Sequence, residues 1–96
     1  MNAYTIFLSP DAITDLADGF DYYNKQSYGF GFEFSDTINA YLSKIRQVPT
    51  ASSIRYDEIR VKPVAAFPYT IHYIIDEINQ CIIIVRIFNT YQQPFW

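Results

Sequence analysis

The chain has 96 residues, of which half are hydrophobic and 19% are aromatic, and its formal net charge is −3. This length supports one domain with one core, and this hydrophobic content excludes a disordered chain. The acidic balance argues against a general nucleic-acid binder, because phosphate contacts supply most of the affinity of such proteins.

The first segment predicts a strand followed by a helix. An apolar run from Ala3 to Leu8 predicts the strand. Ser9 and Pro10 then predict a helix start, with Ser9 as the N-cap and Pro10 at the first helical position. Apolar residues at helical spacing predict one buried face, and aspartates recur on the opposite, solvated face. The apolar set is Ile13, Leu16, Ala17 and Phe20, and the acidic set is Asp11, Asp15, Asp18 and Asp21.

A stretch rich in turn formers, from Asn24 to Gly31, predicts the connection to a second helix that Pro49 ends. The apolar residues of this helix again recur every three or four positions. They are Phe34, Ile38, Tyr41, Leu42, Ile45 and Val48. The two helices form a helical hairpin whose apolar faces need a cover.

The second half of the chain predicts strands. The stretch from Ile59 to Lys62 alternates apolar and basic residues, which is typical of a half-buried strand. The runs from Tyr69 to Ile75 and from Cys81 to Phe88 are rich in β-branched and aromatic residues and predict a β-hairpin. The order β-α-α-β-β-β predicts the α+β class, with the helical hairpin on a mostly antiparallel sheet, in one domain over residues 1–96.

Three cations in these strands are candidates for function. Arg60 and Lys62 lie two residues apart and therefore on one face of a strand, either a solvated face or the phosphate-facing edge of a concave surface. Arg86 lies within an apolar run, where an unpaired charge is costly. It needs an open cleft or a carboxylate partner, with Asp57, Glu58 or a bound protein as alternatives.

The remaining polar residues predict little chemistry. His72 is the only histidine, lies within a strand and is expected to be a hydrogen-bonded packing residue. No Cys or His stands at metal-ligand spacing from it, so we predict no metal and no cofactor. Cys81, the only cysteine, is expected to pack as a small hydrophobe. The terminal Pro94-Phe95-Trp96 is expected to fold back, because burial of a tryptophan is favourable.

Neither a membrane span nor a signal peptide is predicted. The longest apolar run is far shorter than the ~20 residues that a membrane span needs. The N-terminus lacks the basic start and apolar stretch of a signal peptide. We therefore expect a cytoplasmic protein.

Three segments together resemble the RelE/ParE superfamily of toxins from bacterial type II toxin–antitoxin systems. They are the start YTIFLSPDAITDLADGFDYY, the Phe67-Pro68-Tyr69 step leading into YTIHYII, and the ending IIIVRIFNTYQQPFW. The resemblance covers almost the whole chain. It implies a small twisted antiparallel sheet with two helices on one face, and a cognate antitoxin that wraps and neutralises the toxin.

The superfamily has two branches, of which one cuts messenger RNA in the ribosome and the other poisons DNA gyrase. Cleavage by attack of the 2′-hydroxyl needs a base, a leaving-group acid and a cation. Arg86 is the candidate cation and Tyr91 the candidate acid, with Arg60 as a third candidate catalytic residue. Lys62 and Asn89 are candidate target-binding residues.

Two departures from the ribonuclease pattern favour the gyrase branch. Asn89 stands where many relatives carry a histidine, and asparagine cannot shuttle a proton. Tyr91 stands where many relatives carry a basic residue. The resemblance therefore favours ParE-like action over mRNA cleavage. The alternatives are a RelE-type mRNA interferase, an inactive member that only binds as a co-repressor, and an unrelated small α+β domain.

Overall fold

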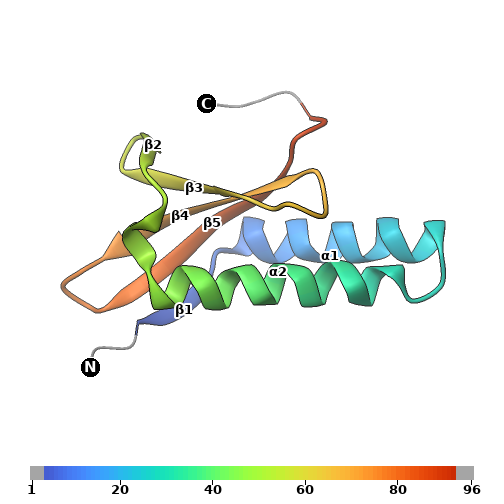
Figure 1. Ribbon diagram of the computed structural model, residues 1–96, viewed down its shortest axis with the longest axis horizontal. Coiled ribbons are helices and arrows are strands. Elements are labelled where there is room, and N and C mark those ends of the chain that lie inside the picture. Colours follow the sequence, from blue (N-terminus) through green and yellow to red (C-terminus); the bar gives the residue numbers. More distant parts are fainter. Residues whose placement is uncertain (1–3, 93–96) are drawn as a thin grey trace.

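The computed structural model describes residues 4–92, which form a five-stranded sheet with a helical hairpin on one face (Figure 1). This arrangement confirms the predicted α+β class. The expected fold-back of Pro94-Phe95-Trp96 lies outside the described residues. No helix within residues 4–92 is long and apolar enough to cross a membrane. The elements are β1 (Thr5–Leu8), α1 (Pro10–Gln26), α2 (Phe30–Gln47), a 3-10 turn (Pro49–Ala51), β2 (Ile54–Tyr56), β3 (Ile59–Pro63), β4 (Tyr69–Asp76) and β5 (Cys81–Asn89).

Helix α1 begins where the sequence predicts, but it buries a different face. Ser9 caps the helix by accepting a hydrogen bond from the Ala12 N–H at 3.0 Å. The buried residues are Ala12, Gly19 and Tyr23, whereas Ile13 is 56% exposed. The predicted apolar face is therefore wrong at Ile13, and also at Ala17, which is exposed. Because Ala12 and Gly19 are small, α1 can pack closely against the hydrophobic core.

Helix α2 buries the face that its spacing predicts except at Val48, which follows the last helical residue and is 55% exposed. Phe34, Ile38, Leu42 and Ile45 are buried, and the helix ends at Gln47, before Pro49. Rings from several elements meet at the centre of the core, where centroid distances from Phe34 are 5.2 Å to Tyr23, 5.3 Å to Phe67 and 4.8 Å to Tyr69. Aromatic side chains thus fill much of the space between the helices and the sheet.

The sheet has the strand order β1-β5-β4-β3-β2. The last strand, β5, lies between the first strand, to which it is parallel, and β4, to which it is antiparallel. The sheet is therefore mostly antiparallel, as expected. Strand β2 was not predicted. It pairs with β3 through a tight turn in which Asp57 and Glu58 have φ of 43° and 67°.

Candidate functional site

Strand β5 carries a bulge that helix α1 holds in place. His72 of β4 pairs with Arg86, and the next residue, Tyr73, pairs with Ile84, so Val85 has no opposite residue on β4. The Ser9 hydroxyl donates to the Val85 carbonyl at 2.8 Å. A bulge locally bends its strand and re-aims the neighbouring side chains, and here it directs Arg86 to α1.

Asp15 of α1 is the partner of Arg86. Its Oδ2 accepts from Arg86 Nε at 2.7 Å, and its Oδ1 accepts from a terminal guanidinium nitrogen at 2.9 Å. The same Oδ2 also accepts from the Ile87 backbone N–H at 2.9 Å. Such a two-pronged, charge-assisted pair is strong and geometrically specific.

The Asp15–Arg86 pair is largely shielded from solvent, and it acts as a structural contact within the fold. The side chains are 29% exposed for Arg86 and 13% for Asp15. Hydrogen bonding to Asp15 raises the pKa of Arg86 further above its ordinary value. The suggested partners Asp57 and Glu58 were wrong, and so was the placement of Asp15 on a solvated face. Asp57 and Glu58 both lie in the exposed turn between β2 and β3.

His72 lies on the sheet face away from the helices, where its imidazole is shielded from solvent and neutral. It is completely buried, with Nδ1 2.9 Å from the Tyr56 hydroxyl and Nε2 2.8 Å from Thr70 Oγ1. Burial lowers the pKa of His72 to about 4, and the charges of Arg86 and Arg55 lower it as well. These contacts confirm the expected hydrogen-bonded packing role.

Arg60 and Lys62 lie on the helix side of the sheet. They pair with Tyr73 and Ile71, two core residues, and paired residues share a face. Arg60 donates to the Ser52 carbonyl at 2.7 Å, and Lys62 Nζ lies 5.8 Å from the ring centroid of Tyr41 on α2. The register turns both cations toward the helices, and phosphate binding by Arg60 and Lys62 stays a prediction.

Asn89 and Tyr91 follow the bulge at the end of β5. Asn89 lines a small cavity of about 220 Å³ together with Asp15, Asp18 and Tyr69. Burial raises the pKa of Tyr69 to about 12, so its hydroxyl stays protonated. Tyr91 is 86% exposed, and its backbone N–H donates to Asn89 Oδ1 at 2.9 Å.

The structure therefore brings only part of the predicted set together. Arg86 and Asn89 both border Asp15, whereas Arg60 and Lys62 stand on another strand and face other partners. Sequence reasoning missed Asp15. Asp15 lies between Ala12 and Gly19 on the buried face of α1, and this position could have indicated its role. The larger apolar residues Ile13 and Ala17 instead suggested a different buried face.

The titratable groups beside Arg86 within residues 4–92 are themselves hydrogen-bonded. The guanidinium is engaged by Asp15, and both nitrogens of the imidazole of His72 have hydrogen-bond partners. Within residues 4–92, no three His, Cys, Asp or Glu side chains are grouped to hold a metal ion. The Asp15–Arg86 pair thus holds the bulged part of β5 against helix α1.

Comparison with solved structures identifies the same architecture in another protein. A structure described as "Chromosomal ParDE TA system from P. aeruginosa" superposes with a TM-score of 0.78 at 16% sequence identity. The match covers 93% of this chain and 98% of the other. No protein-family model matches the sequence, and no curated protein matches it significantly. The structural match confirms the expected RelE/ParE-like fold.

Proposed function

We propose that this chain is the toxin of a type II toxin–antitoxin pair and that a cognate antitoxin neutralises it in the cytoplasm. The observation that carries the proposal is the structural match to a ParDE TA system over almost the full length of both chains. Fold alone does not give function. The three sequence segments that resemble the toxin superfamily add to the match.

Within this proposal, we favour ParE-like action on DNA gyrase over cleavage of messenger RNA. Nucleolytic attack needs a base beside the cation that stabilises the charged phosphorane. Arg86 instead forms a two-pronged pair with Asp15, and His72 is buried with a pKa of about 4. Asn89 cannot transfer a proton. These features support a toxin that acts by binding.

The test is induction of the chain in bacteria with and without the neighbouring antitoxin gene. We expect growth arrest that the antitoxin relieves, together with DNA breaks covalently linked to gyrase. Messenger RNA ends are mapped in the same cultures. Codon-phased cuts would contradict the gyrase target but not the toxin assignment, whereas normal growth without antitoxin would contradict the toxin assignment itself.

A further inference from the structure

Strand β1 is an edge strand, and residues 4–92 supply no neighbour for its outer side. On its inner side, the Thr5 N–H donates to the Gln80 carbonyl at 3.1 Å. Alternate residues direct their backbone groups to opposite sides of a strand. The N–H and C=O groups of Ile6 and Leu8 therefore point outward, away from β5.

The sequence of this edge allows it to pair with a copy of itself. A twofold axis sets each residue near it against its own counterpart, so a charged residue there would repel itself. Strand β1 has the sequence TIFL, with no charge, and no proline or bulge blunts it. The opposite edge, β2, has only three residues and an irregular register against β3. Of the two edges, β1 is the one suited to self-pairing.

The exposed ring of Phe7 fixes the register of such a pair. Phe7 is 55% exposed, and its backbone groups belong to the inward set. In an antiparallel pair centred on Phe7, the two copies of this residue meet at a non-hydrogen-bonded position, where side chains approach most closely. Ile6 then lies opposite Leu8 of the second copy, and the two residues exchange both of their backbone hydrogen bonds. The centre of the interface is thus an aromatic pair, which is favourable across strands.

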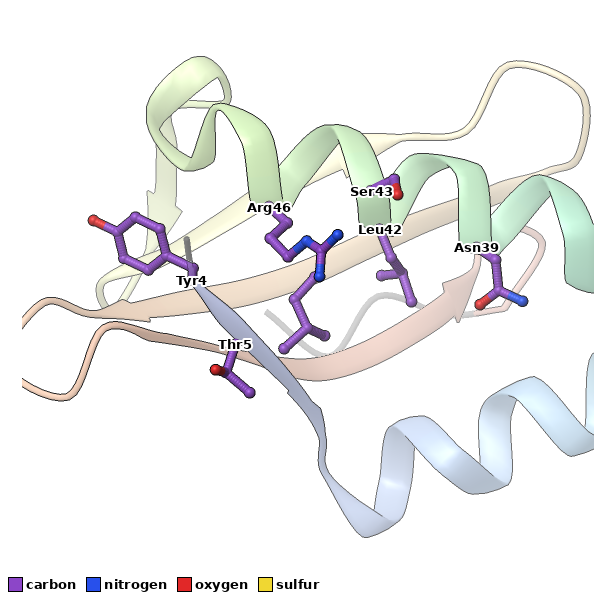
Figure 2. A pocket seen from close by; sticks show the side chains of 7 residues that line it. Tyr4, Thr5, Asn39, Leu42, Ser43 and Arg46 are labelled. Atoms are coloured by element: carbon purple, nitrogen blue, oxygen red, sulfur yellow. The ribbon is translucent and has the colours of Figure 1, made fainter. Parts of the chain in front are cut away.

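Helix α2 leaves this edge open on the helix side of the sheet. A groove of about 470 Å³ lies between β1 and α2, and Arg46 is its only charged lining residue. Figure 2 shows Asn39, Leu42 and Arg46 extending from α2 toward β1. The register centred on Phe7 sets Tyr4 opposite Pro10 of the second copy. The first turn of the second copy's α1 therefore arrives at the mouth of this groove.

The charges that meet there are opposite. Asp11 is exposed in the first turn of α1. Arg46 is exposed in the last turn of α2 and forms no ion pair with the rest of residues 4–92. The symmetry makes the contact between Asp11 and Arg46 twice, once on each side of the axis. Complementary charge of this kind selects a partner and fixes its orientation.

We infer that the free chain pairs with a second copy of itself through β1. The two sheets join in antiparallel fashion at Phe7, and Asp11 of each copy faces Arg46 of the other. The pairing does not require the toxin function proposed above. A four-residue strand and one helical turn make a small interface, which is typical of weak association. The expected Kd is about 1–100 μM.

The first arm of the test measures mass by analytical ultracentrifugation. The wild-type chain is expected to be monomeric at about 0.1 μM and mainly dimeric at about 1 mM. Phe7→Asp sets like charges against each other at the axis and is expected to weaken the dimer by at least about tenfold. Tyr28→Asp makes the same kind of change at a fully exposed position between the helices. Its expected effect is less than about threefold. Thermal unfolding verifies that each variant folds.

The second arm exchanges the two charges across the interface. Arg46→Glu alone and Asp11→Lys alone each place like charges together at both symmetric contacts. Each is expected to weaken its own dimer by about fivefold or more. An equimolar mixture of the two variants has one native and one reversed ion pair. The mixture is therefore expected to associate within about threefold of the wild-type affinity.

The third arm follows amide hydrogen exchange at low and high concentration. The Ile6 and Leu8 amides are expected to slow by at least about fivefold in the dimer, because only the second copy pairs with them. The Phe7 amide bonds within the sheet and is expected to be slow in both states.

Three outcomes would overturn the self-pairing. They are a wild-type chain that stays monomeric at about 1 mM, a dimer that Phe7→Asp weakens no more than Tyr28→Asp does, and a dimer in which the Ile6 amide stays fast. A mixture of the charge variants that associates no better than either variant alone would overturn the contact between Asp11 and Arg46. These measurements contain no antitoxin, so their failure leaves the proposed function standing.

Discussion

A single carboxylate, Asp15, receives three donors from the far end of the chain. Two belong to the guanidinium of Arg86 and one to the backbone of Ile87. Removing the acceptor leaves a partly buried cation and a backbone N–H without their partner, and such orphaned groups cost more than the bond itself contributes.

Asp15→Ala is therefore expected to lower the free energy of unfolding by about 2–3 kcal/mol, as measured by urea denaturation. The matched control is Asp18→Ala, because Asp18 is exposed on the same helix. Its expected effect is within about 0.5 kcal/mol. Equal losses for the two variants would contradict the role that we assign to Asp15.

His72 makes the stability of the domain depend on pH. Its pKa is about 4 in the folded chain, against 6.5 for the unperturbed group, so the unfolded state binds more protons between these values. Stability is therefore greatest above about pH 6.5 and falls as the pH drops toward 4, by about 3 kcal/mol from this group. His72→Gln is expected to flatten this part of the pH profile. An NMR titration that gives His72 a pKa near 6.5 would contradict the prediction.

Among the secondary-structure elements, helix α1 connects the N-terminal part of the chain to the last strand, β5. Its cap, Ser9, accepts from Ala12 N–H and donates to the carbonyl of the bulged Val85. Its middle contacts the core through Gly19, where an added Cβ would lie 2.5 Å from Phe34 Cε2 and 3.2 Å from the Tyr69 hydroxyl. One helix thus aligns the bulge, the last strand and the aromatic core.

Ser9→Ala is expected to destabilise the domain by about 1–2 kcal/mol, because it removes both the helix cap and the bond to the bulge. Ser53→Ala, at an exposed loop position, serves as the control and is expected to be nearly neutral. Urea denaturation compares the two. A Ser9 variant as stable as the Ser53 variant would show that neither bond contributes.

Gly19→Ala is expected to destabilise by about 1–3 kcal/mol, although alanine has the higher helix propensity. The reason is overlap with the ring of Phe34, which is fully buried and cannot retreat freely. Ala17→Gly, at an exposed position of α1, measures the propensity effect separately, at about 1 kcal/mol. A stabilising Gly19→Ala would contradict the close packing.

The sequence predicts elements well where local chemistry decides them, as at the Ser9-Pro10 helix start and the β4–β5 hairpin. It misses β2, because three residues and a turn without glycine give too weak a pattern. It also misses the pair between Asp15 and Arg86, which are 71 residues apart. Similarly, the side on which Arg60 lies depends on pairing with β4, and no local periodicity reports that register.

At the scale of the whole molecule, one helix is rich in acidic residues and a cluster of basic residues lies elsewhere. Helix α1 carries four aspartates, whereas Lys44 and Arg46 lie in the last turn of α2, near Lys62 of β3. Lys44 and Lys62 approach the same ring, that of Tyr41, so the basic residues form a local cluster at the end of α2. Complementary charge on a partner fixes orientation and raises the association rate.

Antitoxin binding is expected to stabilise the entire domain. At a free antitoxin concentration of 100 times Kd, linkage adds about 2.7 kcal/mol, which raises the thermal midpoint of a domain this size by about 10 °C or more. Differential scanning calorimetry with increasing antitoxin measures the shift. A midpoint that does not move would contradict the proposed partnership.

The position of β5 between β1 and β4 also determines when the chain can fold. The fifth strand along the chain lies inside the sheet, between β1 and β4, and it carries the bulge that Ser9 reaches across 76 residues. Contacts so distant in sequence form slowly, and they cannot form at all on a nascent chain that lacks residues 81–89. A chain terminated before residue 81 would lack both the strand that joins β1 to β4 and the donors for Asp15, so it would not form this sheet.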